Sequence, residues 1–459
     1  MVEDYQMTNI VVGNNFEDML LRELRDLLLL HGKLIKNYDL PILTMETNEV
    51  GGVLTIIQEE LSFQIPDEDI QSVEKLNNDQ MSAYNTIMNA IHQKQSQIFF
   101  VDGPGGTGKT FLYRTIMENL RRNSQIVLAT ASSCIAATLL PGGRTAHSRF
   151  GIPIDIEPIS ICKITKNCDL AKLIRITNAI IWDEVPMINR YCVEALDRSL
   201  QDIMNINAPF GGKIMIMGGY FRQLLPVIEK GSRGQMISAC IVRSQLWATT
   251  KILHLRQNMR SIHDHEFAQF LMRIGDGNEP AKEDDMVKMP AEIVIPWVGE
   301  SSIKKLIQHT FPQLENHGWD ASYMVERAIL TPKNCDVHML NDMIINKFPG
   351  DEHILLSFDE VEGDTHNLYQ QEYLHTIAPG TLPPHILKIK IEAPLMLLRK
   401  IDPKFGFCNG TRLLCRGFFM NLLDVEILKG HNAGKRAFFP RIKLKTTDGA
   451  GLPFVLIRK

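Results

Sequence analysis

The feature that most constrains this chain is a glycine-rich stretch at residues 103–110, which reads Gly-Pro-Gly-Gly-Thr-Gly-Lys-Thr. It completes the pattern Gly-x-x-x-x-Gly-Lys-Thr between the apolar run 98–101 and a helix-like segment that starts at Phe111. In this setting the glycines let backbone N–H groups, together with the positive end of the helix, point at a phosphate. The pattern therefore predicts a nucleotide-binding loop, since a chance glycine-rich turn rarely has both flanks.

Two residues of this loop have specific expected roles. Lys109 should place its charge near the β and γ phosphates, and the Thr110 hydroxyl should bind Mg²⁺. Gln80, one helix before the first strand, offers the donor and acceptor that the adenine edge requires and so favours ATP over GTP, although alone it is a common surface residue. The other candidate nucleotide ligands are Gly103, Pro104, Gly105, Gly106, Thr107 and Gly108.

Length and composition exclude several classes of protein. A chain of 459 residues predicts two or three domains, and a net charge of -4 provides no global basic field, so any nucleic-acid contact must come from a local groove. The eight cysteines form no Cys-x-x-Cys pair, which favours a reduced intracellular compartment. No apolar run is long enough to span a bilayer, so we expect neither a membrane segment nor a signal peptide.

Short apolar runs alternate with helix-like segments from Leu76 onward, which predicts βαβ units and a parallel sheet with ligands at the carboxyl ends of its strands. The strands expected in this sheet are 98–101, 126–129, 179–182, 214–217 and 252–255. A second apolar run at 328–330, followed by a helix-like segment at 337–348, suggests that a second α/β unit begins there. The last part reads as mostly β, with strands expected at 394–398, 411–414 and 438–444.

The N-terminal part reads differently. Residues 16–30 have apolar side chains near helical spacing and predict an amphipathic helix, more simply packed on a neighbouring domain than bound to a partner. The stretch 37–52, with Pro41 and the pair Gly51-Gly52, reads as a linker.

Polar side chains follow three of the predicted strands. Asp183 can hold Mg²⁺ and Glu184 can polarise an attacking water, although adjacent carboxylates also occur as ordinary helix N-terminal charges. Gln223 lies one strand later, where an amide can sense a γ phosphate. Arg260 follows the last strand and could reach the nucleotide from a second lobe, or it could simply precede a helix capped by Ser261.

Taken in order, these motifs resemble the Pif-type (petite integration frequency) DNA helicases of superfamily one. The segments that carry the resemblance are 76–80, 103–110, 183–187, 209–213, 221–227 and 258–260. Segments 142–150 and 408–412 favour a narrower resemblance to the helicase of Helitron transposons.

The resemblance implies an ATP-dependent helicase that translocates 5′ to 3′ on single-stranded DNA and unwinds duplex DNA, with Lys109, Asp183, Glu184, Gln223 and Arg260 as catalytic residues. It implies an α/β fold of two RecA-like parallel-sheet lobes, the second incomplete. The expected domains are 1–64 (helix and linker), 65–250 (ATPase domain 1A) and 251–459 (partial domain 2A with a β-rich 2B-like insertion). Nuclear localisation and roles in repair, recombination or telomere maintenance are further expectations.

Residues that match the DNA-facing segments of such enzymes cluster in two places. His147 and Phe150 could stack on bases while the others reach phosphates, or they could belong to a packed loop. These candidates are Ser132, Ser133, His147, Arg149 and Phe150.

Three departures from the family pattern temper this expectation. Cys134 stands where the family has glycine and Tyr220 where it has aspartate, and we expect the chain to lack the last two C-terminal motifs and the transposon's N-terminal nuclease region. An ATP- and DNA-binding remnant without unwinding activity is therefore the alternative. A small-molecule kinase would explain Lys109 but not the ordered series through Arg260.

Overall fold

The computed structural model describes residues 50–63, 69, 71–228, 231–261, 263–280, 286–364, 368–377, 382–402, 405–419, 421–430, 432–446 and 452–459. The predicted helix at 16–30 lies outside the described residues. The chain divides into two compact units, Met1–Glu59 and Glu60–Lys459, and the account below concerns the second. Helix α3 (Val50–Leu61) already begins within the stretch expected to be a linker.

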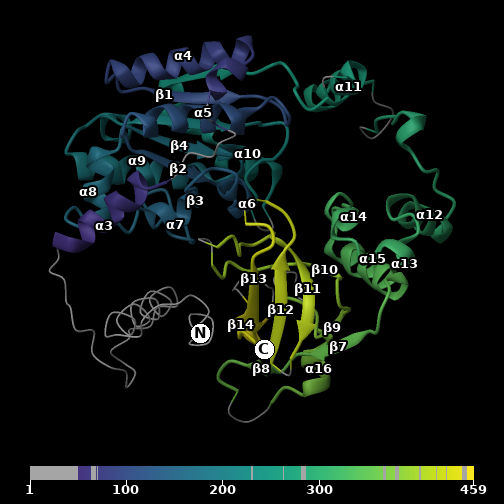
Figure 1. Cartoon of the computed structure of the whole chain (residues 1–459). Coiled ribbons are helices and arrows are strands. Elements are labelled where there is room, and N and C mark those ends of the chain that lie inside the picture. The colour runs from purple at the N-terminus through teal and green to yellow at the C-terminus, as the bar shows by residue number, and fades with distance from the viewer. Residues whose placement is uncertain are drawn as a thin grey trace, which may run out of the picture. The chain divides into compact units, whose positions relative to one another are not determined.

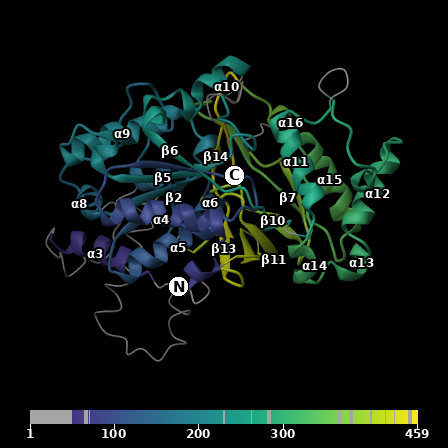
Figure 2. The ribbon, with the colours of Figure 1, turned by 90° about the horizontal axis from the view of Figure 1, so that it is seen from above.

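A six-stranded parallel sheet forms the centre of the first half of this unit (Figures 1 and 2). Its order is β3-β2-β4-β5-β1-β6, and all five predicted strands are confirmed within a few residues. The sixth strand, β3, was not expected because it has only two residues. The strands are β1 (Ile98–Asp102), β2 (Val127–Ala131), β3 (Arg144–Thr145), β4 (Ala179–Asp183), β5 (Ile214–Gly219) and β6 (Thr250–His254).

Helices cover both faces of this sheet, which explains why its inner strands are apolar runs rather than alternating patterns (Figure 2). On one face, α4 and α5 pack Ile87, Leu112 and Ile116 against alternate strand residues such as Phe99 and Ile181. The helices of this half are α4 (Asn78–His92), α5 (Lys109–Arg122), α6 (Cys134–Thr138), α7 (Ala146–Phe150), α8 (Asp169–Ile176), α9 (Arg190–Met204), α10 (Arg233–Ala239) and α11 (His265–Asp276). No helix within the described ranges has the length and apolar character needed to cross a membrane.

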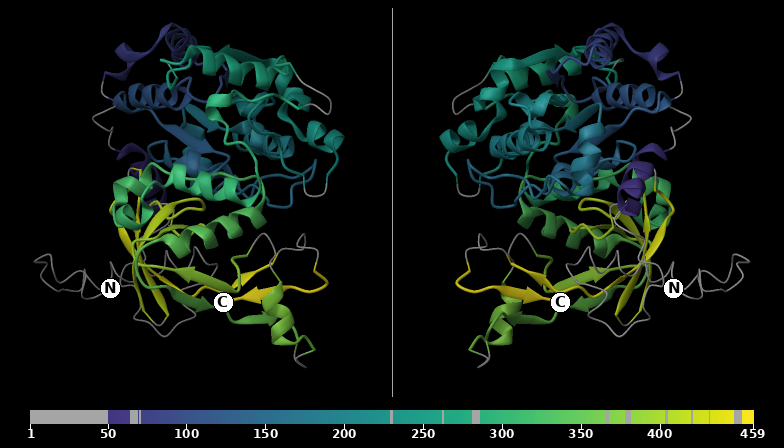
Figure 3. Two further views of the ribbon diagram at one scale, coloured as in Figure 1. Left: turned by 90° about the vertical axis from the view of Figure 1, so that its right-hand side faces the viewer. Right: turned by 90° about the vertical axis from the view of Figure 1, so that its left-hand side faces the viewer.

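The second half has a helical part and a β-rich part (Figure 3). The helices are α12 (Glu300–Thr310), α13 (Leu314–His317), α14 (Ala321–Val325), α15 (Asn334–Lys347) and α16 (Gln371–Thr376). The strands are β7 (His353–Leu356), β8 (Asp359–Val361), β9 (Ile386–Ile389), β10 (Pro394–Met396), β11 (Arg412–Phe418), β12 (Leu422–Ile427), β13 (Arg436–Pro440), β14 (Leu444–Lys445) and β15 (Leu456–Arg458).

The α/β class is confirmed, and the C-terminal stretch is mostly β as expected. Every strand pair after β6 in the described residues is antiparallel, however, so a second parallel sheet is not among them. The strand predicted at 328–330 is wrong: this segment pairs with no described strand, and Leu330 is 92% exposed. Its apolar residues misled the interpretation because Ile329 packs instead on a small helical core around Ile307 and Leu340. The helix expected after it is present as α15.

A buried ion pair fastens β15 to β8. Arg458 donates two hydrogen bonds of 2.8 Å to the Asp359 carboxylate, and both side chains are almost fully buried. Burial alone would raise the pKa of Asp359, but the hydrogen bonds from Arg458 and Ser357 outweigh it and the pKa is lowered. His375 and His385 stack beside this carboxylate in an arrangement that could suit a metal ion. Because Arg458 occupies both carboxylate oxygens, the cluster is already neutralised without one.

Gly218, near the end of β5, provides a test of how closely α5 packs on the six-stranded sheet. An alanine methyl there would lie 1.7 Å from the hydroxyl oxygen of Tyr113, a fully buried side chain on α5. We expect Gly218→Ala to destabilise the protein by about 1–3 kcal/mol in urea denaturation. The Tyr113 hydroxyl has no hydrogen-bond partner among the described residues, so Tyr113→Phe alone should be close to neutral.

The double variant Gly218→Ala/Tyr113→Phe should recover most of that loss, because it removes the overlapping oxygen. Gly234→Ala on α10 is the control, since its nearest neighbouring atom would be 3.9 Å from the new methyl. If the double variant is no more stable than Gly218→Ala, the hydroxyl overlap is not the cause.

Candidate functional site

The predicted phosphate-binding loop lies between the end of β1 and the start of α5, as expected. Gly106 and Gly108 have φ angles of 92° and 78°, a region that only glycine adopts without strain. The Lys109 ammonium is buried and donates a 2.6 Å hydrogen bond to the Gly103 carbonyl. Thr110 follows it in the first turn of α5. The loop is therefore built as the pattern predicts.

Gln80 is not a surface residue. Its side chain is 2% exposed, its amide nitrogen donates to the Thr107 carbonyl at 3.0 Å, and its amide oxygen accepts from the Asn77 backbone N–H at 3.0 Å. The second of these bonds belongs to a capping box that starts α4. Gln80 thus holds the backbone of the phosphate-binding loop at Thr107. Its recognition of adenine stays a prediction.

Asp183 and Glu184 lie at the carboxyl end of β4, two strands from β1 in the same sheet. Asp183 is 4% exposed, and one of its carboxylate oxygens accepts a 2.9 Å hydrogen bond from the Glu184 N–H. Burial, reinforced by the charge of Glu184, raises the pKa of Asp183 to about 6. A buried carboxylate beside a second one is stabilised by a nearby cation. With the Thr110 hydroxyl it supplies the oxygen ligands that Mg²⁺ prefers, so these residues fit the expected metal.

The segment after β6 packs directly on the phosphate-binding loop. The Met259 N–H donates to the Gly106 carbonyl at 2.8 Å, and the Asn258 amide donates to the Gly105 carbonyl at 3.3 Å. The Asn258 amide oxygen in turn accepts from the Arg260 N–H at 2.9 Å. Asn258 therefore positions Arg260 beside the loop. Sequence reasoning missed this role, although Asn258 belongs to the segment 258–260 that carries the family resemblance.

Two sequence expectations around Arg260 need correction. Arg260 follows β6, which pairs with β1, so the first sheet extends past the predicted boundary at residue 250. Helix α11 is capped by Asp264, whose side chain accepts from the Phe267 N–H at 3.0 Å. Ser261 is thus not the cap, because the helix starts one turn later than the pattern suggested.

Gln223 lies in the turn after β5 and is exposed. Its N–H donates to the Tyr220 carbonyl at 3.1 Å, which fixes the turn but not the side chain. The Tyr220 hydroxyl accepts a 2.8 Å hydrogen bond from Arg222, which also pairs with Asp276 at the end of α11. Tyr220 therefore helps to join the end of β5 to α11.

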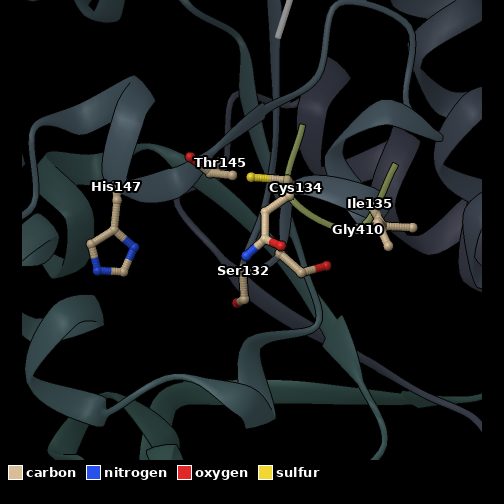
Figure 4. Close-up of a pocket in the computed structure, with 8 residues that line it drawn as sticks. Ser132, Cys134, Ile135, Thr145, His147 and Gly410 are labelled. Carbon is tan, nitrogen blue, oxygen red and sulfur yellow. The ribbon is translucent and has the colours of Figure 1, made fainter. Parts of the chain in front are cut away.

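A pocket of about 410 Å³ adjoins the end of β2 (Figure 4). Its lining includes three of the five predicted DNA contacts, Ser132, Ser133 and His147, together with residues from the loop before β11. In Figure 4 His147 lies at one side and Gly410 at the other. The remaining lining residues are Cys134, Ile135, Thr145 and Asn409.

The structure contradicts the other two predicted DNA contacts. Arg149 is 3% exposed and forms a buried ion pair of 2.5 Å with Glu60. Phe150 is completely buried and packs near Trp182. Their positions on α7 turn them into the protein, so Arg149 cannot reach a phosphate and Phe150 cannot stack on a base in this conformation. The packed-loop alternative is right for Phe150, whereas His147 remains at the pocket.

Asp183→Asn tests the burial of this carboxylate. Because the folded-state pKa is raised, the protein loses stability as pH rises from about 4 to about 6, and above that range the ionised group destabilises the fold. We therefore expect Asp183→Asn to be more stable than the parent by roughly 1–3 kcal/mol in urea denaturation at pH 8, with the gain vanishing near pH 4. The surface carboxylate Asp202, changed to Asn, is the control. A pH-independent difference would contradict this explanation.

Comparisons with known proteins agree with this geometry. Residues 75–285 match the PIF1-like helicase family and residues 372–418 match the 2B domain of the DNA helicase Pif1, together more than half of the chain. The ATP-dependent DNA helicase PIF1 of Danio rerio is 24% identical over 343 residues, which cover 74% of this chain and 46% of that protein. PIF1 of Emericella nidulans is 32% identical over 199 residues, 41% of this chain and 26% of that protein.

Solved structures show the same fold. A Bacteroides Pif1 helicase in complex with ADP-AlF3 and single-stranded DNA matches with a TM-score of 0.55 and 20% identity, over 82% of this chain and 80% of that one. A structure of two coordinating Pif1 helicases at forked duplex DNA matches with a TM-score of 0.56 and 20% identity, over 83% and 79%. The chain spans about half the length, or less, of the curated relatives that it matches. On its sequence, its RecA-like sheet and its phosphate-binding loop, the chain belongs to the PIF1-like helicase family.

Proposed function

We propose that the chain is the motor of an ATP-dependent DNA helicase, which hydrolyses ATP to translocate 5′ to 3′ on single-stranded DNA and unwinds duplex. The observation that carries the proposal is the convergence of three segments on one end of the sheet. The phosphate-binding loop, the pair Asp183-Glu184 and the segment 258–260 all follow strands that end at this edge. The relatives named ATP-dependent DNA helicases support it.

ATP hydrolysis would divide its tasks among these residues. Lys109 and the loop N–H groups bind the β and γ phosphates, while Thr110 and Asp183 hold Mg²⁺, which neutralises charge on the phosphates when bound. Glu184 orients the attacking water. Its backbone is held at a φ of 55°, just after the buried Asp183, so the side chain leaves the sheet at a fixed point. Arg260 stabilises the charge that develops on the γ phosphoryl group.

The pocket beside β2 is the proposed contact with single-stranded DNA. Ser132 and Ser133 offer hydroxyls to phosphates, and burial lowers the pKa of His147, so its ring is neutral at pH 7 and suited to stacking on a base. This pocket is linked to the nucleotide site, because the Ser132 N–H donates to the Asp183 carbonyl at 3.0 Å. A movement of the bound DNA strand would therefore be transmitted through Ser132 to Asp183, the proposed metal-binding residue.

Several finer expectations belong to the same proposal. Gln223 would sense the γ phosphate and Gln80 would favour adenine, and nuclear localisation rests on family analogy. The narrower Helitron relationship is likewise a proposal, as are the expected domain limits other than the one at residue 250, which β6 crosses. The relatives compared are named ATP-dependent DNA helicases, and so bear only on the broader family.

Hydrolysis and strand displacement test the motor directly. Lys109→Ala should abolish single-strand-stimulated ATP hydrolysis, and Glu184→Gln should retain ATP binding but lose hydrolysis by at least ~100-fold. Lys75→Ala, an exposed lysine before α4, is the matched control. Displacement should occur on duplexes with a 5′ single-stranded tail and not on those with a 3′ tail. Hydrolysis without displacement would instead support an ATP- and DNA-binding remnant.

His147 and Arg149 should respond to substitution in opposite ways, although they are two residues apart. His147→Ala should weaken binding of a single-stranded oligonucleotide by about 1–3 kcal/mol and leave the unfolding free energy nearly unchanged. Arg149→Ala should leave Glu60 as an unpaired buried charge and destabilise the fold by about 3–5 kcal/mol. Fluorescence anisotropy and urea denaturation measure the two effects. A stable Arg149→Ala protein with lost DNA affinity would restore the original assignment of this arginine.

A further inference from the structure

Cys134 and Cys408 come together from opposite halves of the second unit. Cys134 is the first residue of α6, beside the end of β2, and Cys408 lies in the loop before β11. Their thiols interact closely enough for each to shift the pKa of the other, and the adjoining residues Ile135 and Gly410 are in contact. Cys134 is half-buried and lines the pocket, whereas Cys408 is 2% exposed and is not among the residues that line it. The two sulfurs thus bridge two segments that the strands of the parallel sheet do not connect.

Both thiols are carried by firmly held backbone. Ser133 caps α6 through a 3.2 Å hydrogen bond from the Ala136 N–H. In the other segment, Thr411 accepts from the Cys408 N–H at 3.1 Å, and the Gly410 N–H donates to the Leu397 carbonyl at 2.7 Å. The side chain of Ile135 packs directly against Gly410. The two cysteines therefore lie at the packed contact between α6 and the loop before β11, which is called the seam below.

The two cysteines differ in reactivity in complementary ways. The interaction with the Cys408 thiol lowers the pKa of Cys134 despite partial burial, and Lys400 and the Asn409 N–H add to the effect. The same interaction and burial raise the pKa of Cys408. Cys134 is thus the half-exposed, thiolate-forming partner, and Cys408 is the buried one. This is the arrangement of an attacking and a resolving cysteine.

The chain contains a built-in comparison. Cys162 and Cys192 are also close to each other, but both are buried, and burial raises their pKa values to about 11 and about 12. Neither lines the pocket. Proximity alone therefore does not distinguish Cys134 and Cys408; the half-exposed position of Cys134 on the pocket wall does.

We propose that Cys134 and Cys408 are a redox modification site that closes to a reversible disulfide under a peroxide. The Cys134 thiolate attacks one peroxide oxygen, the O–O bond breaks, and a sulfenic acid and hydroxide form. The Cys408 thiol then gives up its proton and attacks the Cys134 sulfur, and the S–O bond breaks to release water. Overall, two thiols are oxidised by two electrons, and one peroxide is reduced to two waters. A dithiol reductant reverses the bond.

The disulfide would tie α6 to the loop before β11 across the pocket. Here the inference rests on the proposed function: if DNA lies in this pocket and moves during the ATP cycle, the cross-link should suppress DNA-stimulated hydrolysis. The phosphate-binding loop is not part of the seam, so ATP binding should persist. Oxidation would then uncouple the motor without emptying its nucleotide site.

Peptide mapping of the full chain tests the bond itself, independently of any activity. After peroxide treatment, blocking of free thiols and tryptic digestion without reductant, we expect residues 123–144 linked to residues 405–412, each of which contains one cysteine. Dithiothreitol should abolish this linked pair. Cys162 and Cys192 should remain reduced, and Cys408→Ser should leave Cys134 as a sulfenic acid that a dimedone probe traps. Absence of the linked pair while exposed Cys335 is oxidised would overturn the proposal.

Hydrolysis assays then test the consequence. Peroxide should lower single-strand-stimulated ATP hydrolysis at least fivefold in the parent, dithiothreitol should restore it, and Cys408→Ser should be insensitive. If the linked peptides form but the stimulation of ATP hydrolysis by single-stranded DNA is unchanged, the disulfide is real and its proposed regulatory effect is contradicted. If the untreated chain shows no stimulation, the proposed function fails while the peptide map still decides the disulfide.

Discussion

The position of β1 between β5 and β6 is the constraint on which the rest of this site depends. Asp102, the last residue of β1, is in register with Gly219 on one side and His254 on the other. Three loops therefore leave the sheet at the same level: the phosphate-binding loop, the turn that carries Gln223 and the segment that carries Arg260. The hydrogen bonds from Asn258 and Met259 to the first loop follow from this register. One strand alignment thus assembles residues that are far apart in sequence.

The conformation of the phosphate-binding loop and the position of Asp183 at a strand end could be predicted from sequence because both are local features. The loop needs glycines at fixed offsets, and Asp183 follows a run of four buried apolar residues, so pattern and position coincide. Asn258 and the buried setting of Gln80 escaped prediction because their roles depend on contacts with residues that are distant in the chain. The strand expected at 328–330 failed for a related reason: a short apolar run does not reveal whether a neighbouring strand or a helical core will cover it.

The expected DNA contacts show most clearly where prediction from sequence reaches its limit. Arg149 has the chemistry of a phosphate ligand, yet its partner is Glu60, which no local pattern connects to it. His147, two residues earlier on the same short helix, points to the pocket instead. Residue type predicted what these side chains could do, and only tertiary packing determines which of them reaches the surface. If single-stranded DNA lies in this pocket as proposed, its recognition depends on hydroxyls and one neutral ring rather than on an arginine.

The ion pair between Arg458 and Asp359 has a consequence for how the chain is made. Strand β15 supplies Arg458 to a carboxylate that was synthesised about a hundred residues earlier, so the small sheet of β8, β14 and β15 cannot close until residue 458 has left the ribosome. Until then Asp359 must stay hydrated. The parallel sheet, by contrast, is complete once His254 has emerged. The nucleotide-binding half can therefore fold during translation, while the C-terminal strands are still being added.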